Sequence, residues 1–312
     1  MSIEDHLSTH ISAEPRSGGE WRSWLLIPTV YGTWMLAAFA WSALGAVAGT
    51  ALLTLATCWF MSLQHELIHG HPSRSQRVNR LFGLAPLAVW YPYELYRTSH
   101  LAHHRDELLT EPGIDPESNY IAEADYLRLH ACLRPLWIAQ RTVLGRFLLG
   151  PLMVIAPTWY DIVRRPLCGD FSQWRSWAVH LVLLGAVLWA LDRWAGISPM
   201  RYVLTVGYPA LGLAMLRSFY EHRPAETSSH RVVINEAGFF WRMLYLNNNY
   251  HAVHHERPDL PWYRVRKFYL AHRAHVLAQN GGFVVAGYLS LIRRYALTTV
   301  DSPVHPMPAV DD

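Results

Sequence analysis

Two pairs of long uncharged runs dominate the pattern of hydrophobic and polar positions along the chain. The first pair fills residues 24–63, forty consecutive residues without a charged side chain. The second pair comprises residues 177–191 and 202–216, two runs of fifteen whose flanking arginines can reach a membrane surface. Because a membrane-spanning helix needs about 20 apolar residues, we predict four spans in two hairpins, with a buried hairpin as the alternative for the second pair. Their expected bounds are about 24–41, 44–63, 177–194 and 201–217.

Two shorter uncharged segments fall below the length of a crossing. Residues 81–93 and 147–160 are thirteen and fourteen residues long, and each contains two prolines, which interrupt helices. We expect both segments to lie along the membrane surface. The sequence thus predicts an all-α integral membrane protein with one membrane domain, residues 24–295. An N-terminal tail, residues 1–23, and a C-terminal tail, residues 296–312, flank this domain.

The distribution of basic residues predicts the orientation. If the four runs all cross, the outer loops hold only Arg193 and Arg201, and the other side holds the remaining 25 of the 27 basic residues. This excess is typical of cytoplasmic loops, so both termini should be cytoplasmic. The net charge of +3 has no basic stripe interleaved with aromatics and does not indicate nucleic-acid binding. Abundant arginine beside a single lysine suggests a GC-rich bacterial genome and hence a bacterial inner membrane.

Candidate chemistry enters with three groups of histidines, all on the predicted cytoplasmic side. They are His65 and His69, then His100, His103 and His104, then His251, His254 and His255. Histidines three and four apart share one face of a helix and can bind one metal ion. Eight are too many for a single tetrahedral zinc, and they suit two metals with several imidazoles each. Histidines scattered by chance on solvated helices are the alternative.

The order and spacing of these groups resemble the three histidine boxes of the membrane fatty acid desaturase superfamily. The boxes read HxxxH, HxxHH and HxxHH, and residues 254–263 resemble the HH-x-x-P-x-x-P run that follows the third box. The resemblance covers about residues 62–263. It implies two non-heme irons, O2 as co-substrate, a lipid or acyl-chain substrate and a cytoplasmic cap that carries the metal site. Since no heme-binding HPGG run is present, electrons should come from an external ferredoxin-like protein or cytochrome.

The resemblance also implies a ninth ligand, His222, between the second and third boxes. Many family members carry an asparagine four residues before this histidine, but here that residue is Ser218, which argues against a water-linked asparagine ligand. His71 follows the first box off its ligand face and is expected to be a bystander. The predicted ligands are therefore His65, His69, His100, His103, His104, His222, His251, His254 and His255.

Three further residues are expected to support the metal ligands without binding the metals themselves. Asn247 and Asn248 can orient imidazoles of the third box by hydrogen bonds, although helix capping is an equal alternative. Glu66 lies between the two histidines of the first box and is expected to play a similar part. The loop of residues 110–120, with two prolines and a glycine, is expected to be solvated.

The function that these features favour is that of a fatty acyl desaturase. A hydroxylase or carotenoid ketolase of the same superfamily is the near alternative, because the motifs do not decide between loss of a second hydrogen and addition of oxygen. From another class, His65-Glu66-x-x-His69 also satisfies the HExxH signature of zinc proteases, with Glu66 as general base. A metal-storing membrane protein without catalysis is the remaining alternative.

Overall fold

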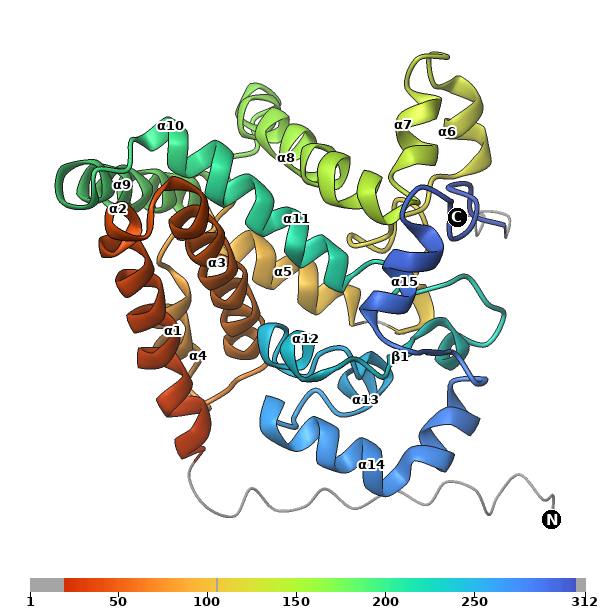
Figure 1. Cartoon of the computed structure of the whole chain (residues 1–312). Coiled ribbons are helices and arrows are strands. Elements are labelled where there is room, and N and C mark those ends of the chain that lie inside the picture. Colours follow the sequence, from red (N-terminus) through yellow and green to blue (C-terminus); the bar gives the residue numbers. More distant parts are fainter. Residues whose placement is uncertain (1–19, 105, 307–312) are drawn as a thin grey trace, which may run out of the picture.

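The computed structural model describes residues 20–104 and 106–306, and the described chain is helical through most of its length (Figure 1). The strands are β1 (Ile234–Asn235) and β2 (Val284–Val285), which pair in parallel. This arrangement agrees with the predicted helical class. Residues 1–19 of the predicted N-terminal tail lie outside the described part of the chain.

The first predicted hairpin is formed by α1 (Trp21–Phe39), the short α2 (Trp41–Leu44) and α3 (Ala46–Ile68). Gly45 makes the turn with a φ of 80°, a left-handed conformation that costs glycine little. A Cβ on Gly49 would lie 2.7 Å from the carbonyl oxygen of Trp41, so α2 can pack closely on α3 only because this residue is glycine. The first hairpin thus leads the chain back to the first histidine box at the end of α3.

The second hairpin is also helical but less regular than the sequence suggests. Helix α9 (Trp174–Ala190) continues through the π-helical turn η3 (Leu191–Ala195), and Gly196 reverses the chain in a left-handed conformation. The returning limb runs without a break through α10 (Pro199–Arg201), the π-helical η4 (Tyr202–Gly207) and α11 (Tyr208–Arg217). Trp34 of α1 donates a hydrogen bond to the Tyr202 hydroxyl at 3.1 Å, which joins the two hairpins.

Three helical segments are long and apolar enough to cross a membrane: α3, α8 (Val143–Leu167) and residues 174–195. The first and last of these contain two of the predicted spans. Helix α8 is longer than the predicted surface segment, because its prolines are accommodated inside the helix instead of ending it. Helix α1 and the limb of residues 199–217 do not reach this combination of length and hydropathy within the described chain.

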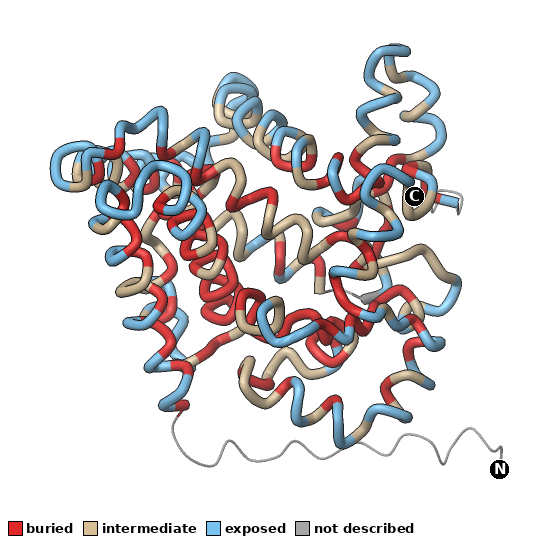
Figure 2. Tube along the Cα trace, viewed as in Figure 1, coloured by how far each residue is buried: buried red, intermediate tan, exposed pale blue. Residues whose placement is uncertain are grey.

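The remaining helices surround the end of α3. Helices α4 (Gln76–Gly83) and α5 (Tyr93–His103) follow it directly, and α12 (Phe239–Leu244) lies against it, with the Ser62 hydroxyl donating to the Leu244 carbonyl at 2.8 Å. Figure 2 shows buried residues concentrated along α3 and along residues 244–255, which lead from the end of α12 into α13. The last elements of this cap are α13 (His251–Glu256), α14 (Trp262–Gln279) and α15 (Tyr288–Tyr295). Two peripheral helices, α6 (Glu123–Arg128) and α7 (Arg134–Ala139), precede α8.

The described part of the predicted C-terminal tail, residues 296–306, packs back onto the cap. Val304 pairs with Ile121 in a parallel bridge, and the Tyr120 hydroxyl donates a hydrogen bond to Asp301 at 2.6 Å. Asp301 also pairs with Arg141, whose side chain is buried. These contacts hold the C-terminal segment against the loop that precedes α6.

Candidate metal centre

The nine predicted histidine ligands converge from four parts of the chain. Helix α3 and its C-cap supply the first box, α5 and its C-cap the second, and α13 the third. His222 follows α11 and is held beside the strand region by a bridge to Val232. The side chains gather into two clusters, each with geometry that could hold a metal ion.

The first cluster combines histidines from all three boxes. Ring nitrogens of His65, His69, His100 and His254 all lie within 4.8 Å of one another. Nε2 of His69 is 2.8 Å from Nε2 of His100. Nε2 of His104 is 3.1 Å from Nε2 of both His100 and His254, which places this fifth histidine at the same cluster.

The second cluster contains His103, His222, His251 and His255, again with ring nitrogens within 4.8 Å of one another. Nε2 of His222 lies 3.0 Å from Nε2 of His103 and 3.1 Å from Nε2 of His251. Nε2 of His255 lies 3.2 Å from Nε2 of His251. Thus His222, which the sequence marks only by resemblance, occupies the middle of this cluster.

Histidines four residues apart within one box lie in the same cluster. Residues four apart, such as His100 and His104 or His251 and His255, have ring centroids 4.7 and 4.6 Å apart and belong to the same cluster. His103, three residues after His100, has its ring centroid 5.9 Å away and joins the other cluster. In the third box, His254 belongs to the first cluster, whereas His251 and His255 belong to the second. Each HxxHH box therefore serves both clusters.

The spacing of the ring nitrogens fits metal coordination. A metal–imidazole bond of about 2.1 Å puts neighbouring ligand atoms about 3.0 Å apart in an octahedron and about 3.4 Å apart in a tetrahedron. The contacts within the clusters measure 2.8 to 3.2 Å. A neutral imidazole carries one N–H, so Nε2 of His222 cannot donate to both of its neighbours. A cation would satisfy the converging lone pairs, and imidazole sets suit iron, zinc, copper or nickel.

Two carboxylates from the loop of residues 110–120 orient histidines of the second box. Oδ1 of Asp115 lies 2.8 Å from Nδ1 of His103, and Oε1 of Glu117 lies 3.1 Å from Nδ1 of His100. The expectation of a solvated loop is wrong here, because Asp115 is buried and accepts hydrogen bonds from the backbone N–H groups of Thr110 and Glu117. The signal in the sequence is weak, because Asp115 and Glu117 are two of five acidic residues between residues 105 and 120.

Burial keeps most of these histidines in the neutral form that binds metals. It is the largest cause that lowers the pKa of His222, His251, His254 and His255 well below the usual histidine value. His103 differs. Burial opposes its charge, but the carboxylates of Glu117 and Asp115 outweigh burial and raise its pKa to about 9. A metal at this cluster would therefore displace a proton from His103.

The predicted supporting residues take different positions. Asn248 lies between the clusters, with Nδ2 3.3 Å from Nε2 of His65 and Oδ1 3.3 Å from Nδ1 of His251. Glu66 and Asn247 instead hold the backbone of Trp262, since Glu66 accepts from its N–H at 3.1 Å and Asn247 donates to its carbonyl at 2.9 Å. Glu66 ties the start of α14 to the end of α3, and Asn247 ties it to the segment after α12.

His71 lies outside both clusters. Its Nδ1 is 2.8 Å from a carboxylate oxygen of the buried Glu20, just before α1. This contact joins the chain after the first box to the start of the first hairpin.

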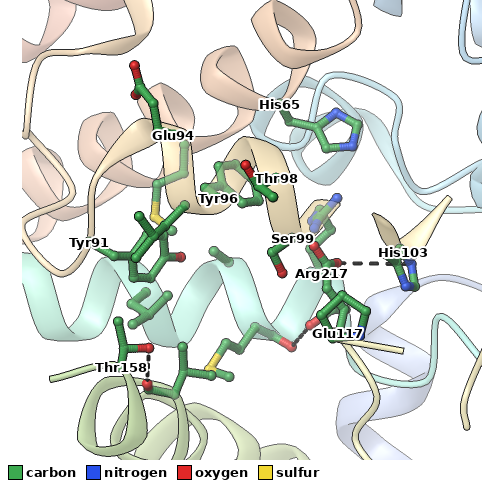
Figure 3. Close-up of a pocket in the computed structure, with 18 of the residues that line it drawn as sticks. His65, Tyr91, Glu94, Tyr96, Thr98, Ser99, His103, Glu117, Thr158 and Arg217 are labelled. Atoms are coloured by element: carbon green, nitrogen blue, oxygen red, sulfur yellow. Dashed lines mark hydrogen bonds and ion pairs between the residues drawn. The ribbon is translucent and has the colours of Figure 1, made fainter. Parts of the chain in front are cut away.

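A cavity of about 880 Å³ opens beside both clusters. This is within the range of about 300–1,000 Å³ typical of small-molecule sites. Figure 3 shows His65 and His103 on one side of the cavity and Tyr91 and Thr158 on the other, with Arg217 near the histidines. The cavity reaches the corner between α8 and α9, so it gives a ligand access from that corner to the clusters.

The fold and site define a helical protein with membrane-type helices and two all-histidine clusters at the wall of a cavity. Residues 40–286 match the family Fatty acid desaturase. The chain therefore belongs to the membrane fatty acid desaturase superfamily. No curated protein matches it.

Proposed function

We propose that this protein is an O2-dependent membrane oxidoreductase with two non-heme irons, and that it desaturates a fatty acyl chain. The observation that carries this proposal is the pair of histidine clusters at the wall of one cavity, in a chain of the desaturase family. The clusters would hold one iron each, with His104 completing the first. Hydroxylation or ketone formation on a lipid is the alternative outcome at the same site.

The bound irons would supply O2 activation and removal of hydrogen from an unactivated C–H bond. The chain's own contribution is geometry and exclusion of water. Asp115 and Glu117 fix the tautomers of His103 and His100 through their Nδ1 atoms, so that the Nε2 lone pairs face the clusters. Asn248 orients His251, because its Oδ1 can accept a hydrogen bond from the Nδ1–H of that ring and leave the Nε2 lone pair toward the second cluster.

The site also limits the topology. Because His65 and His222 belong to clusters that touch, the chain between them must cross the membrane an even number of times. We propose that residues 174–195 and 199–217 cross, and that α8 lies along the cytoplasmic surface. This arrangement keeps Arg164 and Arg165 of α8 on the cytoplasmic side, as the positive-inside rule favours. The site and both termini then face the cytoplasm, in a bacterial inner membrane.

The proposed reaction needs partners beyond the lipid. Desaturation consumes two electrons in addition to those of the substrate, and the proposal assigns them to an external ferredoxin-like protein or cytochrome at the cytoplasmic face. No nucleic-acid partner is proposed.

The zinc-protease alternative is disfavoured by the position of Glu66. A general base must reach a metal-bound water, but the Glu66 carboxylate accepts a hydrogen bond from the Trp262 backbone and does not line the cavity. His65 and His69 are also part of a larger cluster, which a protease would not need.

Lipid analysis of cells that express the chain tests the proposed function. We expect a lipid whose mass falls by about 2 units on desaturation, or rises by about 16 on hydroxylation, only when the chain is present. The matched control is His255→Ala, which removes one ligand of the second cluster. Identical lipids in cells with the chain, in cells without it and in cells with His255→Ala would refute the proposal.

A further inference from the structure

Two arginines line the cavity, and they differ in how their charge is compensated. Arg165, on α8 at the corner with α9, is paired twice: Nη1 lies 2.8 Å from Asp170 and Nε lies 3.4 Å from Asp161. Arg217, at the end of α11, has Glu221 as its nearest carboxylate, with Nη1 3.8 Å from Oε1, and the negative charge of Glu117 also acts on it from farther away. Within the described chain, the Arg217 guanidinium makes no hydrogen bond.

The position of Arg217 brings its charge beside the clusters. Figure 3 shows its side chain near His65 and His103. The Glu221 oxygen that faces Arg217 also lies 3.6 Å from Nδ1 of His251, a member of the second cluster. One carboxylate oxygen thus separates this guanidinium from a cluster histidine. A ligand oxygen bound by Arg217 would therefore lie in the cavity, beside the second cluster.

A buried guanidinium with unused donors favours an oxygen-bearing ligand. The Arg217 side chain is only 14% exposed, and burying a charged group is costly unless it is paired and hydrogen-bonded. Its donors form a rigid fork that matches a carboxylate. These features fit an oxygenated substrate better than a bare hydrocarbon.

We propose that Arg217 binds the carboxylate of a free fatty acid inside the cavity, next to the clusters. The proposal rests on the proposed function and narrows it, because the carbons presented to the clusters are then those close to the carboxylate and not those at mid-chain. The apolar tail would extend past Tyr91 and Leu211 toward α8. Arg165, already neutralised by two aspartates, would not bind the carboxylate.

Binding measurements without turnover test this assignment. Wild-type enzyme, purified with its metals in lipid nanodiscs, is titrated with labelled palmitate and, separately, with hexadecane, which has the same chain without the carboxylate. We expect Arg217→Gln to weaken palmitate binding about tenfold to hundredfold, as loss of charge-assisted hydrogen bonds predicts, and to change hexadecane binding less than about twofold. Arg217→Lys should retain part of the affinity, and Arg165→Gln should leave palmitate binding unchanged.

Each other result overturns the assignment. If Arg217→Gln weakens the binding of palmitate and of hexadecane equally, Arg217 only balances the charge of Glu221. Weakening of palmitate by Arg165→Gln but not by Arg217→Gln would put the carboxylate at the α8–α9 corner. Failure of palmitate to bind the wild-type protein also refutes the assignment. A variant whose metal content equals that of the wild type is taken as correctly folded. Because no oxidation is needed, Arg217-dependent binding could hold even if lipid analysis refutes the proposed reaction, and the two failures remain distinguishable.

Discussion

Oδ1 of Asp115 lies 2.8 Å from Nδ1 of His103, and both side chains are buried. The two residues are twelve positions apart, on a loop and on α5, yet the contact determines which ring nitrogen of His103 faces the second cluster. Nε2 is turned toward His222, at 3.0 Å. A carboxylate behind a histidine ligand fixes its tautomer and increases its basicity.

Asp115→Asn should therefore weaken metal binding at the second cluster by about 10- to 100-fold, since the amide cannot match a carboxylate as acceptor. Competition with a chelator, followed by metal analysis, measures the change. The control is Asp125→Asn, which alters an exposed residue that pairs with Arg128 on the surface of α6. Equal metal retention in both variants would show that Asp115 has no such role.

The two clusters predict two metal ions per chain and a separable loss of each. His69→Ala with His254→Ala removes two members of the first cluster, and His222→Ala with His255→Ala removes two members of the second. Each double variant should retain about one metal, because at most three histidines remain at the altered cluster and the other is intact. Metal analysis that gives one ion in the wild type contradicts the two-site arrangement.

Glu66→Gln separates the oxidoreductase from the protease. The glutamine oxygen can still accept from the Trp262 N–H, so lipid oxidation should persist at a reduced rate. A protease that used Glu66 as its base would lose activity outright. The readouts are oxidised lipid and cleavage of membrane proteins in the same cells. Proteolysis that disappears in the variant would favour the protease.

Cys168, the C-cap of α8, reports the topology directly, because it is exposed and native. If α8 lies along the cytoplasmic surface, an impermeant thiol reagent applied outside intact cells should miss Cys168. The same reagent should label a cysteine placed at Gly196 in a background in which Cys132 and Cys168 are replaced by serine. Labelling of Cys168 from outside would instead mean that α8 crosses the membrane.

Asp301→Ala should destabilise the cap. Its removal leaves the buried Arg141 guanidinium without this carboxylate and leaves the Tyr120 hydroxyl only its longer bond, at 3.4 Å, to the His222 carbonyl. Breaking a buried pair in this way costs about 3–5 kcal/mol, and because Asp301 is partly exposed we expect a value near the lower end. Thermal unfolding in detergent, with Asp125→Ala as control, measures the effect. Equal unfolding temperatures would show that the Asp301 contacts contribute nothing to stability.

The helical class, the first hairpin and the identity of the histidines that converge could be predicted from the sequence. This was possible because these features depend on local periodicity: uncharged runs set the length of a membrane helix, and spacings of three and four place histidines on one helical face. The sequence could also single out Asn248, which follows directly from its place before the third box.

The division of the histidines between two clusters, and the carboxylates that contact their Nδ1 atoms, could not be predicted and depend on tertiary packing. His100 and His103 share a helical face but join different clusters, since each cluster is completed by residues more than a hundred positions away. Asp115 and Glu117 reach the site because the loop folds back under α5, and Arg217 reaches it because α11 ends beside the clusters. Contacts between distant segments depend on packing, and local sequence patterns do not encode which loop will meet which helix.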